Sequence, residues 1–126
     1  FLVVNADIYT DFNFATIKNM NLNGSKGHLV MVKNPKQHPD GDFFLQNNQI
    51  ELEGKERLTF SGIAIYQPKI FEDINIEPVA KLAPILKKLI SAKCISGEAY
   101  QGLWFDIGTP ERLNEVNLFL KEELKS

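Results

Sequence analysis

The chain has a single cysteine, no long apolar run and no glycine-rich phosphate loop, and each absence narrows what the protein can be. Cys94 is the only cysteine among 126 residues, so neither an internal disulfide nor a cysteine cluster for zinc can form. No apolar run approaches the roughly 20 residues that a membrane helix needs, and we find no secretory leader. We therefore expect a cytoplasmic protein that does not bind or span a membrane.

The charged residues also lack any concentration of one sign. There are 14 Lys and Arg residues against 16 Asp and Glu residues, which gives a net charge of -2, and the lysines are spread along the chain. Nucleic-acid binding needs a clustered basic face, so we expect no nucleic-acid partner. The hydrophobic content of 44% is enough for one folded core.

The first residues read as a strand from the inside of a sheet. Phe1-Leu-Val-Val is a continuous apolar run, which is typical of a parallel strand with a neighbour on each side. No turn and no methionine precede it. We therefore expect residues 1–126 to be the later part of a longer protein, whose preceding part is absent here.

Strands and helices are expected to alternate along the rest of the chain. The sequence predicts a hairpin around Asn47-Asn48, because asparagine tolerates the left-handed backbone of a tight turn. It predicts a helix from Leu82 that accepts Pro84 only within its first turn. The remaining predicted elements are a helix near 14–20, strands at 28–33, 58–66, 95–100 and 102–107, and a helix from Pro110 to about Lys125. This order predicts an α/β fold with a mostly parallel, mixed sheet, flanking helices and one β-hairpin.

Two apolar runs end at an acid. Asp7 follows the first run, and Asp106 follows Leu103-Trp-Phe. Ligands of open α/β sheets bind beyond the carboxyl ends of strands, so the two carboxylates can converge on one Mg²⁺ ion. A structural role, in which each acid caps the turn that follows it, explains the same pattern. After Asp106, Gly108 permits a tight turn, and Thr109 and Pro110 suit the start of a helix.

Three segments together resemble the sugar-1-phosphate nucleotidyltransferase family, in their order and in their spacing. They are Phe1-Leu-Val-Val-Asn-Ala-Asp-Ile-Tyr-Thr-Asp, Phe60-Ser-Gly-Ile-Ala-Ile-Tyr and Trp104-Phe-Asp-Ile-Gly-Thr-Pro-Glu-Arg-Leu. Shorter strings resemble its bacterial N-acetylmuramate 1-phosphate uridylyltransferase branch, which acts in peptidoglycan recycling. These strings are Leu2-Val-Val-Asn-Ala-Asp, Lys33-Asn-Pro, Gly41-Asp-Phe, Lys81-Leu-Ala-Pro and Ser96-Gly-Glu.

This resemblance implies the later part of a Rossmann-like nucleotidyltransferase domain. The implied reaction joins a nucleoside triphosphate, UTP for this branch, to a sugar 1-phosphate such as N-acetylmuramate 1-phosphate, with release of pyrophosphate. Asp7 and Asp106 match the family's catalytic magnesium ligands, and Asn5 matches a nucleotide contact. The implied sugar contacts are Gly41, Asp42 and Gly62, the last letting the sugar ring approach the strand.

The chain departs from the family pattern at three places, of which the smallest is Ala6, where relatives have a glycine before the metal aspartate. Many relatives have a Glu-Lys-Pro motif whose lysine binds the sugar phosphate, and Asn34 stands at that lysine here. Lys81 is a hypothetical substitute for the lysine that binds the sugar phosphate. The family's glycine-rich loop for the triphosphate is also missing, since no Gly-x-Gly stretch with a nearby arginine occurs in the sequence. We therefore expect these 126 residues to be inactive alone.

Other functions fit parts of the same pattern. One alternative is transfer to another hexose or heptose 1-phosphate, and another is a nucleotidyltransferase-like module that regulates without catalysis. A metal-dependent glycosyltransferase fits less well, because Asp7 and Asp11 do not form a tight acidic pair.

Overall fold

A computed structural model describes residues 2–5, 7–22, 24–71 and 78–125 of the chain. Its strands are β1 (Leu2–Val4), β2 (Ile8–Thr10), β3 (Gly27–Val32), β4 (Phe43–Gln46), β5 (Gln49–Glu51), β6 (Arg57–Tyr66), β7 (Ile95–Tyr100) and β8 (Trp104–Asp106). Its helices are α1 (Ala15–Lys18), the short 3₁₀ helix η1 (Pro68–Phe71), α2 (Pro78–Ser91) and α3 (Pro110–Lys125). The predicted mixed α/β class is confirmed.

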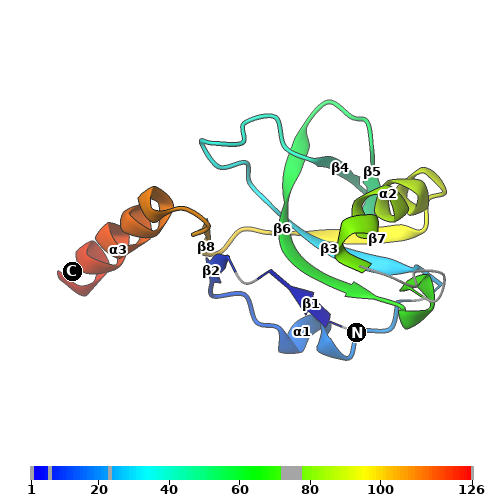
Figure 1. Ribbon diagram of the computed structural model, residues 1–126, viewed down its shortest axis with the longest axis horizontal. Coiled ribbons are helices and arrows are strands. Elements are labelled where there is room, and N and C mark those ends of the chain that lie inside the picture. Colours follow the sequence, from blue (N-terminus) through cyan, green and yellow to red (C-terminus); the bar gives the residue numbers. More distant parts are fainter. Residues whose placement is uncertain (1, 6, 23, 72–77, 126) are drawn as a thin grey trace.

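Six of the strands form one sheet in the order β1-β6-β3-β7-β5-β4. The beginning of the long strand β6 also pairs with β4, so the sheet curls back onto itself. Strands β2 and β8 form a separate two-stranded sheet that lies beside the end of β1, as Figure 1 shows. Helix α3 follows β8 and extends away from the six-stranded sheet.

The prediction of a mostly parallel sheet is wrong for the described residues. There, β3 and β7 are the one parallel pair, and every other pairing is antiparallel. Strand β1 likewise lies at the edge of the described sheet, paired with β6 alone. A continuous apolar run indicates that both faces of a strand are buried, but it does not indicate whether the neighbouring strands are parallel or antiparallel.

Strand β3 is the centre of the core. All six of its residues are buried, and Leu29, Val30 and Met31 alternate between two apolar clusters. Leu29 and Met31 pack with α2 residues on one face of the sheet, and Val30 packs with Phe12 and Ile17 on the other. The buried polar residue of this strand is His28, which is 4% exposed and lies 2.8 Å from both Ser96 Oγ and Glu98 Oε1 on β7.

The local predictions are confirmed where short-range chemistry decides the backbone. Asn47 and Asn48 have φ angles of 52° and 64° in the β4–β5 turn, as the hairpin requires. Helix α3 begins at Pro110, and Thr109 caps it by accepting a hydrogen bond from the Arg112 amide at 3.2 Å. The prediction for Pro84 is wrong, because α2 begins at Pro78 and contains Pro84 in its interior. A helix tolerates such a proline by leaving one carbonyl without its usual amide donor.

Candidate active site

The β2–β8 pair brings the two predicted acids together. Ile8 is the register partner of Asp106, and the amide of Ile107 donates to the carbonyl of Asp7 at 2.8 Å. A methyl group placed on Gly108 would lie 3.1 Å from Asp106 Oδ1 and 3.8 Å from Asp7 Cγ. Both carboxyl groups therefore border the same small space, although they are almost one hundred positions apart in the sequence.

Asp106 also has the structural role that its sequence neighbours allowed. Its Oδ1 accepts from the amide of Gly108 at 2.8 Å, which holds the turn before α3. Its Oδ2 forms an ion pair with Arg112, one turn into the helix. Both side chains are about one-third exposed, so solvent screening limits what this pair adds to stability to about 1 kcal/mol or less. Metal binding and turn stabilisation are compatible, because a carboxylate has more acceptor positions than these two contacts use.

The two acids open onto a cavity of about 360 Å³. Its wall combines carboxylates and amides with two aromatic side chains, and Trp104 is fixed by a 3.0 Å hydrogen bond from its Nε1 to the carbonyl of Ser61. Polar groups that converge beside aromatic faces suit a sugar, which presents both hydroxyls and apolar C–H faces. The lining residues are Asn5, Asp7, Ile8, Pro35, Gln37, His38, Thr59, Phe60, Ser61, Trp104, Asp106 and Arg112.

Asn5 joins this wall from the end of β1. Its amide donates to the carbonyl of Gly62 at 3.0 Å, and its side chain covers the Gly62 backbone. Gly62 has φ = +87°, and the β3–β6 register shifts here between Leu29 and Met31. The sequence pattern allowed either a bulge or a close approach at this glycine, and the structure has both. The approaching group is Asn5, so the predicted contact of Gly62 with a sugar stays a prediction.

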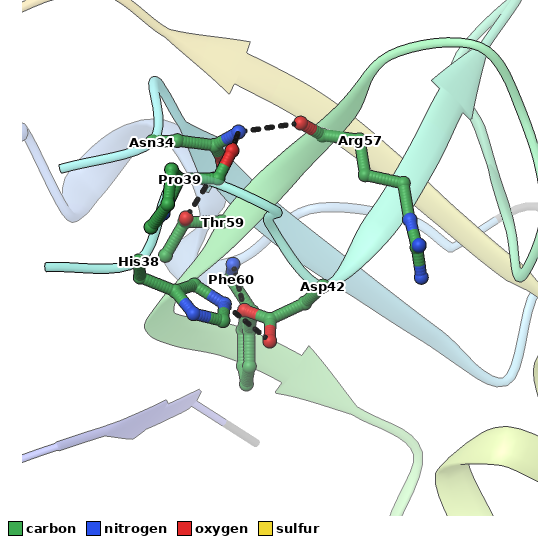
Figure 2. Close-up of polar contacts among 7 residues, drawn as sticks. All are labelled: Asn34, His38, Pro39, Asp42, Arg57, Thr59 and Phe60. Atoms are coloured by element: carbon green, nitrogen blue, oxygen red, sulfur yellow. Dashed lines mark hydrogen bonds and ion pairs between the residues drawn. The ribbon is translucent and has the colours of Figure 1, made fainter. Parts of the chain in front are cut away.

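Gly41 and Asp42 are held by contacts within the protein and not by contacts with the cavity. Gly41 has φ = +68°, and a side chain there would come within 2.7 Å of the Arg57 carbonyl oxygen. Asp42 uses both carboxylate oxygens within the protein: Oδ2 accepts from the Phe60 amide at 2.8 Å, and Oδ1 lies 3.0 Å from His38 Nε2 (Figure 2). Neither residue is among those that line the cavity. Their predicted contact with the sugar also stays a prediction.

Asn34, at the position of the family's lysine, ties a loop together. Its Nδ2 donates to the carbonyls of Pro39 and Arg57, at 3.0 and 2.9 Å, and its Oδ1 accepts from Thr59 Oγ1 at 2.8 Å (Figure 2). Two other lysines lie nearby: Lys33 and Lys36 line a neighbouring cavity of about 310 Å³, with Asp106 and Arg112 on its wall. The side chain of Lys81, the hypothetical substitute, lies outside the described residues.

Sequence reasoning missed Arg112 and His38. Both have side chains on the wall of the cavity, and each pairs with an acid, Asp106 for Arg112 and Asp42 for His38. The i, i+4 spacing of His38 and Asp42 was a signal that could have been used. Within the described ranges, no group of three or more His, Cys, Asp or Glu side chains is arranged to bind a metal, and no helix is long and apolar enough to cross a membrane.

Comparison with known proteins extends the sequence resemblance over almost the whole chain. It is 43% identical over 123 residues to the N-acetylmuramate alpha-1-phosphate uridylyltransferase of Neisseria meningitidis serogroup B, covering 92% of this chain and 53% of that protein. It is 29% identical, over 140 aligned positions, to the bifunctional protein GlmU of Methanococcus aeolicus, covering 100% of this chain and 33% of that protein. No protein-family model matches.

A solved structure shows the same fold. A Bacillus anthracis protein described as a glucose-1-phosphate thymidylyltransferase superposes with a TM-score of 0.73 at 20% identity, over 94% of this chain and 53% of that chain. The chain thus spans about half the length, or less, of the relatives that it matches. Its predicted resemblance to the sugar-1-phosphate nucleotidyltransferases is confirmed by these comparisons.

Proposed function

We propose that the complete protein transfers a nucleotide to a sugar 1-phosphate, and that the 126 residues form the metal and sugar side of its site. The nucleotide donor is UTP, the acceptor is N-acetylmuramate 1-phosphate, and pyrophosphate leaves. The observation that carries the proposal is the meeting of Asp7 and Asp106 at one cavity whose wall also contains Trp104 and Phe60. The choice of UTP and of N-acetylmuramate 1-phosphate is supported by the Neisseria meningitidis relative, through its name and 43% identity.

The donor set at this cavity fits a magnesium ion. Mg²⁺ binds one or two protein carboxylates and fills the rest of its octahedron with water and phosphate oxygens, so Asp7 and Asp106 would hold it. When bound, the ion would neutralise charge on the triphosphate during transfer. Arg112 would share Asp106 with the ion, and its ion pair orients the carboxylate while it lowers the negative charge of the site.

The side chains around the acids position the acceptor. Trp104 is held by its bond to Ser61 and offers an apolar face for the sugar ring, while Asn5 stands beside the acids at the end of β1. Lys33 and Lys36 place positive charge near Asp106, on the wall of the neighbouring 310 Å³ cavity. They would bind the sugar phosphate in place of the family's lysine, because Asn34 uses its side chain for hydrogen bonds within the loop. Holding both reactants in line accounts for most of the catalysis expected of such a site.

The test measures pyrophosphate release by the complete protein with UTP, N-acetylmuramate 1-phosphate and varied magnesium. Asp7→Asn and Asp106→Asn should each lower kcat by about 100-fold or more, the loss typical for one transition-state charge contact. Asp40→Asn, at an exposed acid outside the cavity, should stay within about 2-fold. Arg112→Gln should lower the magnesium concentration needed for half-maximal rate, because the ion no longer shares Asp106 with a guanidinium.

Full activity in both Asp→Asn variants would refute the metal assignment. Glucose, mannose and heptose 1-phosphates in the same assay identify the acceptor, and preference for one of them would refute only the choice of N-acetylmuramate 1-phosphate. The isolated 126-residue chain should release no pyrophosphate, since it contains no glycine-rich loop for the triphosphate.

A further inference from the structure

His38 and Asp42 form a fixed pair at the edge of the candidate site. His38 begins a tight loop: its amide donates to the Pro35 carbonyl at 3.0 Å, and its own carbonyl accepts from the Gly41 amide at 3.4 Å. Figure 2 shows its imidazole beside the Asp42 carboxylate, with Nε2 lying 3.0 Å from Oδ1. The Asp42 carboxylate is held in turn by the Phe60 amide on β6. The ring is therefore oriented by an acid that is itself anchored to the sheet.

This arrangement leaves one ring nitrogen for a ligand. Nε2 faces Asp42, whereas Nδ1 has no hydrogen-bond partner among the described residues. His38 lines the 360 Å³ cavity, and Asp42 does not. The histidine therefore borders the ligand space, whereas the acid that orients it is outside the cavity lining. A carboxylate beside one ring nitrogen determines which nitrogen of a neutral ring carries the proton.

The charges on the cavity wall indicate what this nitrogen would bind. Among the lining residues, His38 and Arg112 are the basic ones, and Arg112 is paired with Asp106. Among the lining residues, His38 is therefore the basic group that is not paired with one of the two acids. A ring protonated on both nitrogens donates Nε2–H to Asp42 and Nδ1–H to a second carboxylate. Without that ring, Asp42 would repel an anionic ligand.

We propose that His38, oriented by Asp42, binds the carboxylate of an acidic sugar 1-phosphate, an inference that rests on the proposed function. N-acetylmuramate carries such a carboxylate on its ether-linked lactyl group, whereas N-acetylglucosamine has a hydroxyl there. His38 is thus a specificity-determining residue for the acceptor, and Asp42 is a positioning residue that acts through it. A charge-assisted hydrogen bond of this kind distinguishes the two sugars by about 10- to 100-fold in affinity.

The experiment compares two acceptors in the complete protein, N-acetylmuramate 1-phosphate and N-acetylglucosamine 1-phosphate, each with UTP and magnesium. His38→Gln keeps an amide near Asp42 and removes the ionisable ring. It should raise KM for the acidic sugar by about 10-fold or more, while KM for the neutral sugar and both kcat values change by less than about 3-fold. Asp42→Asn should reduce the preference for the acidic sugar in the same direction. The matched control Asp40→Asn removes a charge from the same loop and should keep the preference unchanged.

An equal rise in both KM values in His38→Gln would overturn the proposal, because a structural role or a contact with a shared hydroxyl acts on both sugars. Unchanged KM values would overturn it as well. Calorimetric titration of the same variants with each sugar 1-phosphate, without nucleotide, separates this failure from that of the proposed function. A wild-type protein that binds the acidic sugar better, and loses this preference in His38→Gln, retains the His38 site even if it transfers no nucleotide. A wild-type protein that binds both sugar 1-phosphates equally in titration would overturn the proposal.

Discussion

Replacing Gly62 by alanine tests the contact between Asn5 and β6 on which one side of the cavity depends. Gly62 has φ = +87°, and a methyl group there would lie 2.5 Å from Asn5 Nδ2 and 2.9 Å from Asn5 Cβ. Two costs therefore add. A non-glycine residue at such a φ costs about 1 to 3 kcal/mol, and forcing the neighbouring side chain out of place costs about 1 to 3 kcal/mol more.

Gly24 is a matched control within the same chain. Its φ is +91°, yet no described residue other than its chain neighbours lies within 4 Å of a methyl group placed on it. Gly24→Ala should therefore lose only the backbone part, about 1 to 3 kcal/mol. The difference between the two variants measures the displacement of Asn5. Urea denaturation of the complete protein gives both free energies of unfolding, and KM values for UTP and the sugar 1-phosphate report the displaced side chain.

A double variant decides between crowding and backbone strain. Asn5→Gly removes all three atoms that crowd the new methyl group, so Gly62→Ala in this background should cost no more than Gly24→Ala. If Gly62→Ala costs as much in the Asn5→Gly background as in the wild type, Asn5 does not control this position, and our reasoning is refuted.

Two further predictions concern the loop and the core. Asn34→Lys, which restores the family's lysine, should lower the free energy of unfolding of the complete protein in urea by about 2 to 4 kcal/mol, because three hydrogen bonds are lost. The control Lys36→Ala, at an exposed residue, should change it by less than about 0.5 kcal/mol. An unaltered unfolding midpoint for Asn34→Lys would contradict this. Burial raises the pKa of Tyr66 to about 12, so its neutral form stabilises the fold below pH 10, and this contribution should be lost between pH 10 and pH 12. Tyrosinate absorbance of Tyr66→Phe should lack a phenol that titrates near pH 12 in the wild type, and an unchanged titration would contradict the prediction.

Local chemistry made several elements predictable from sequence. The Asn47-Asn48 turn and the capped start of α3 depend on residues within a few positions of each other, and both were predicted correctly. The convergence of Asp7 and Asp106 was also predicted, from the apolar runs before both acids and from family-like motifs. The structure reaches it differently, because Asp7 directly precedes β2 and Asp106 ends β8 in an antiparallel pair. That these acids bind magnesium stays a prediction.

What the sequence did not predict depends on contacts between distant segments. Strand direction is one case: β3 is buried on both faces, and an apolar run looks the same beside parallel and antiparallel neighbours. The role of Asp42 is another. Its side chain is satisfied by His38 and by the Phe60 amide, and the second of these becomes a neighbour only when β6 pairs with β4. The hydrogen bonds of Asn34 with Arg57 and Thr59 likewise join residues that are distant in the sequence.

The separate β2–β8 sheet has a consequence for how the protein moves. Its two short strands come from opposite ends of the sequence and bury little compared with β3, so this unit should open more readily than the main sheet, by sub-global unfolding. The Ile107 amide, bonded to the Asp7 carbonyl, would then exchange with solvent faster than amides of β3. A ligand that bridges the two acids would slow that exchange, so the site would gain rigidity only as it is filled.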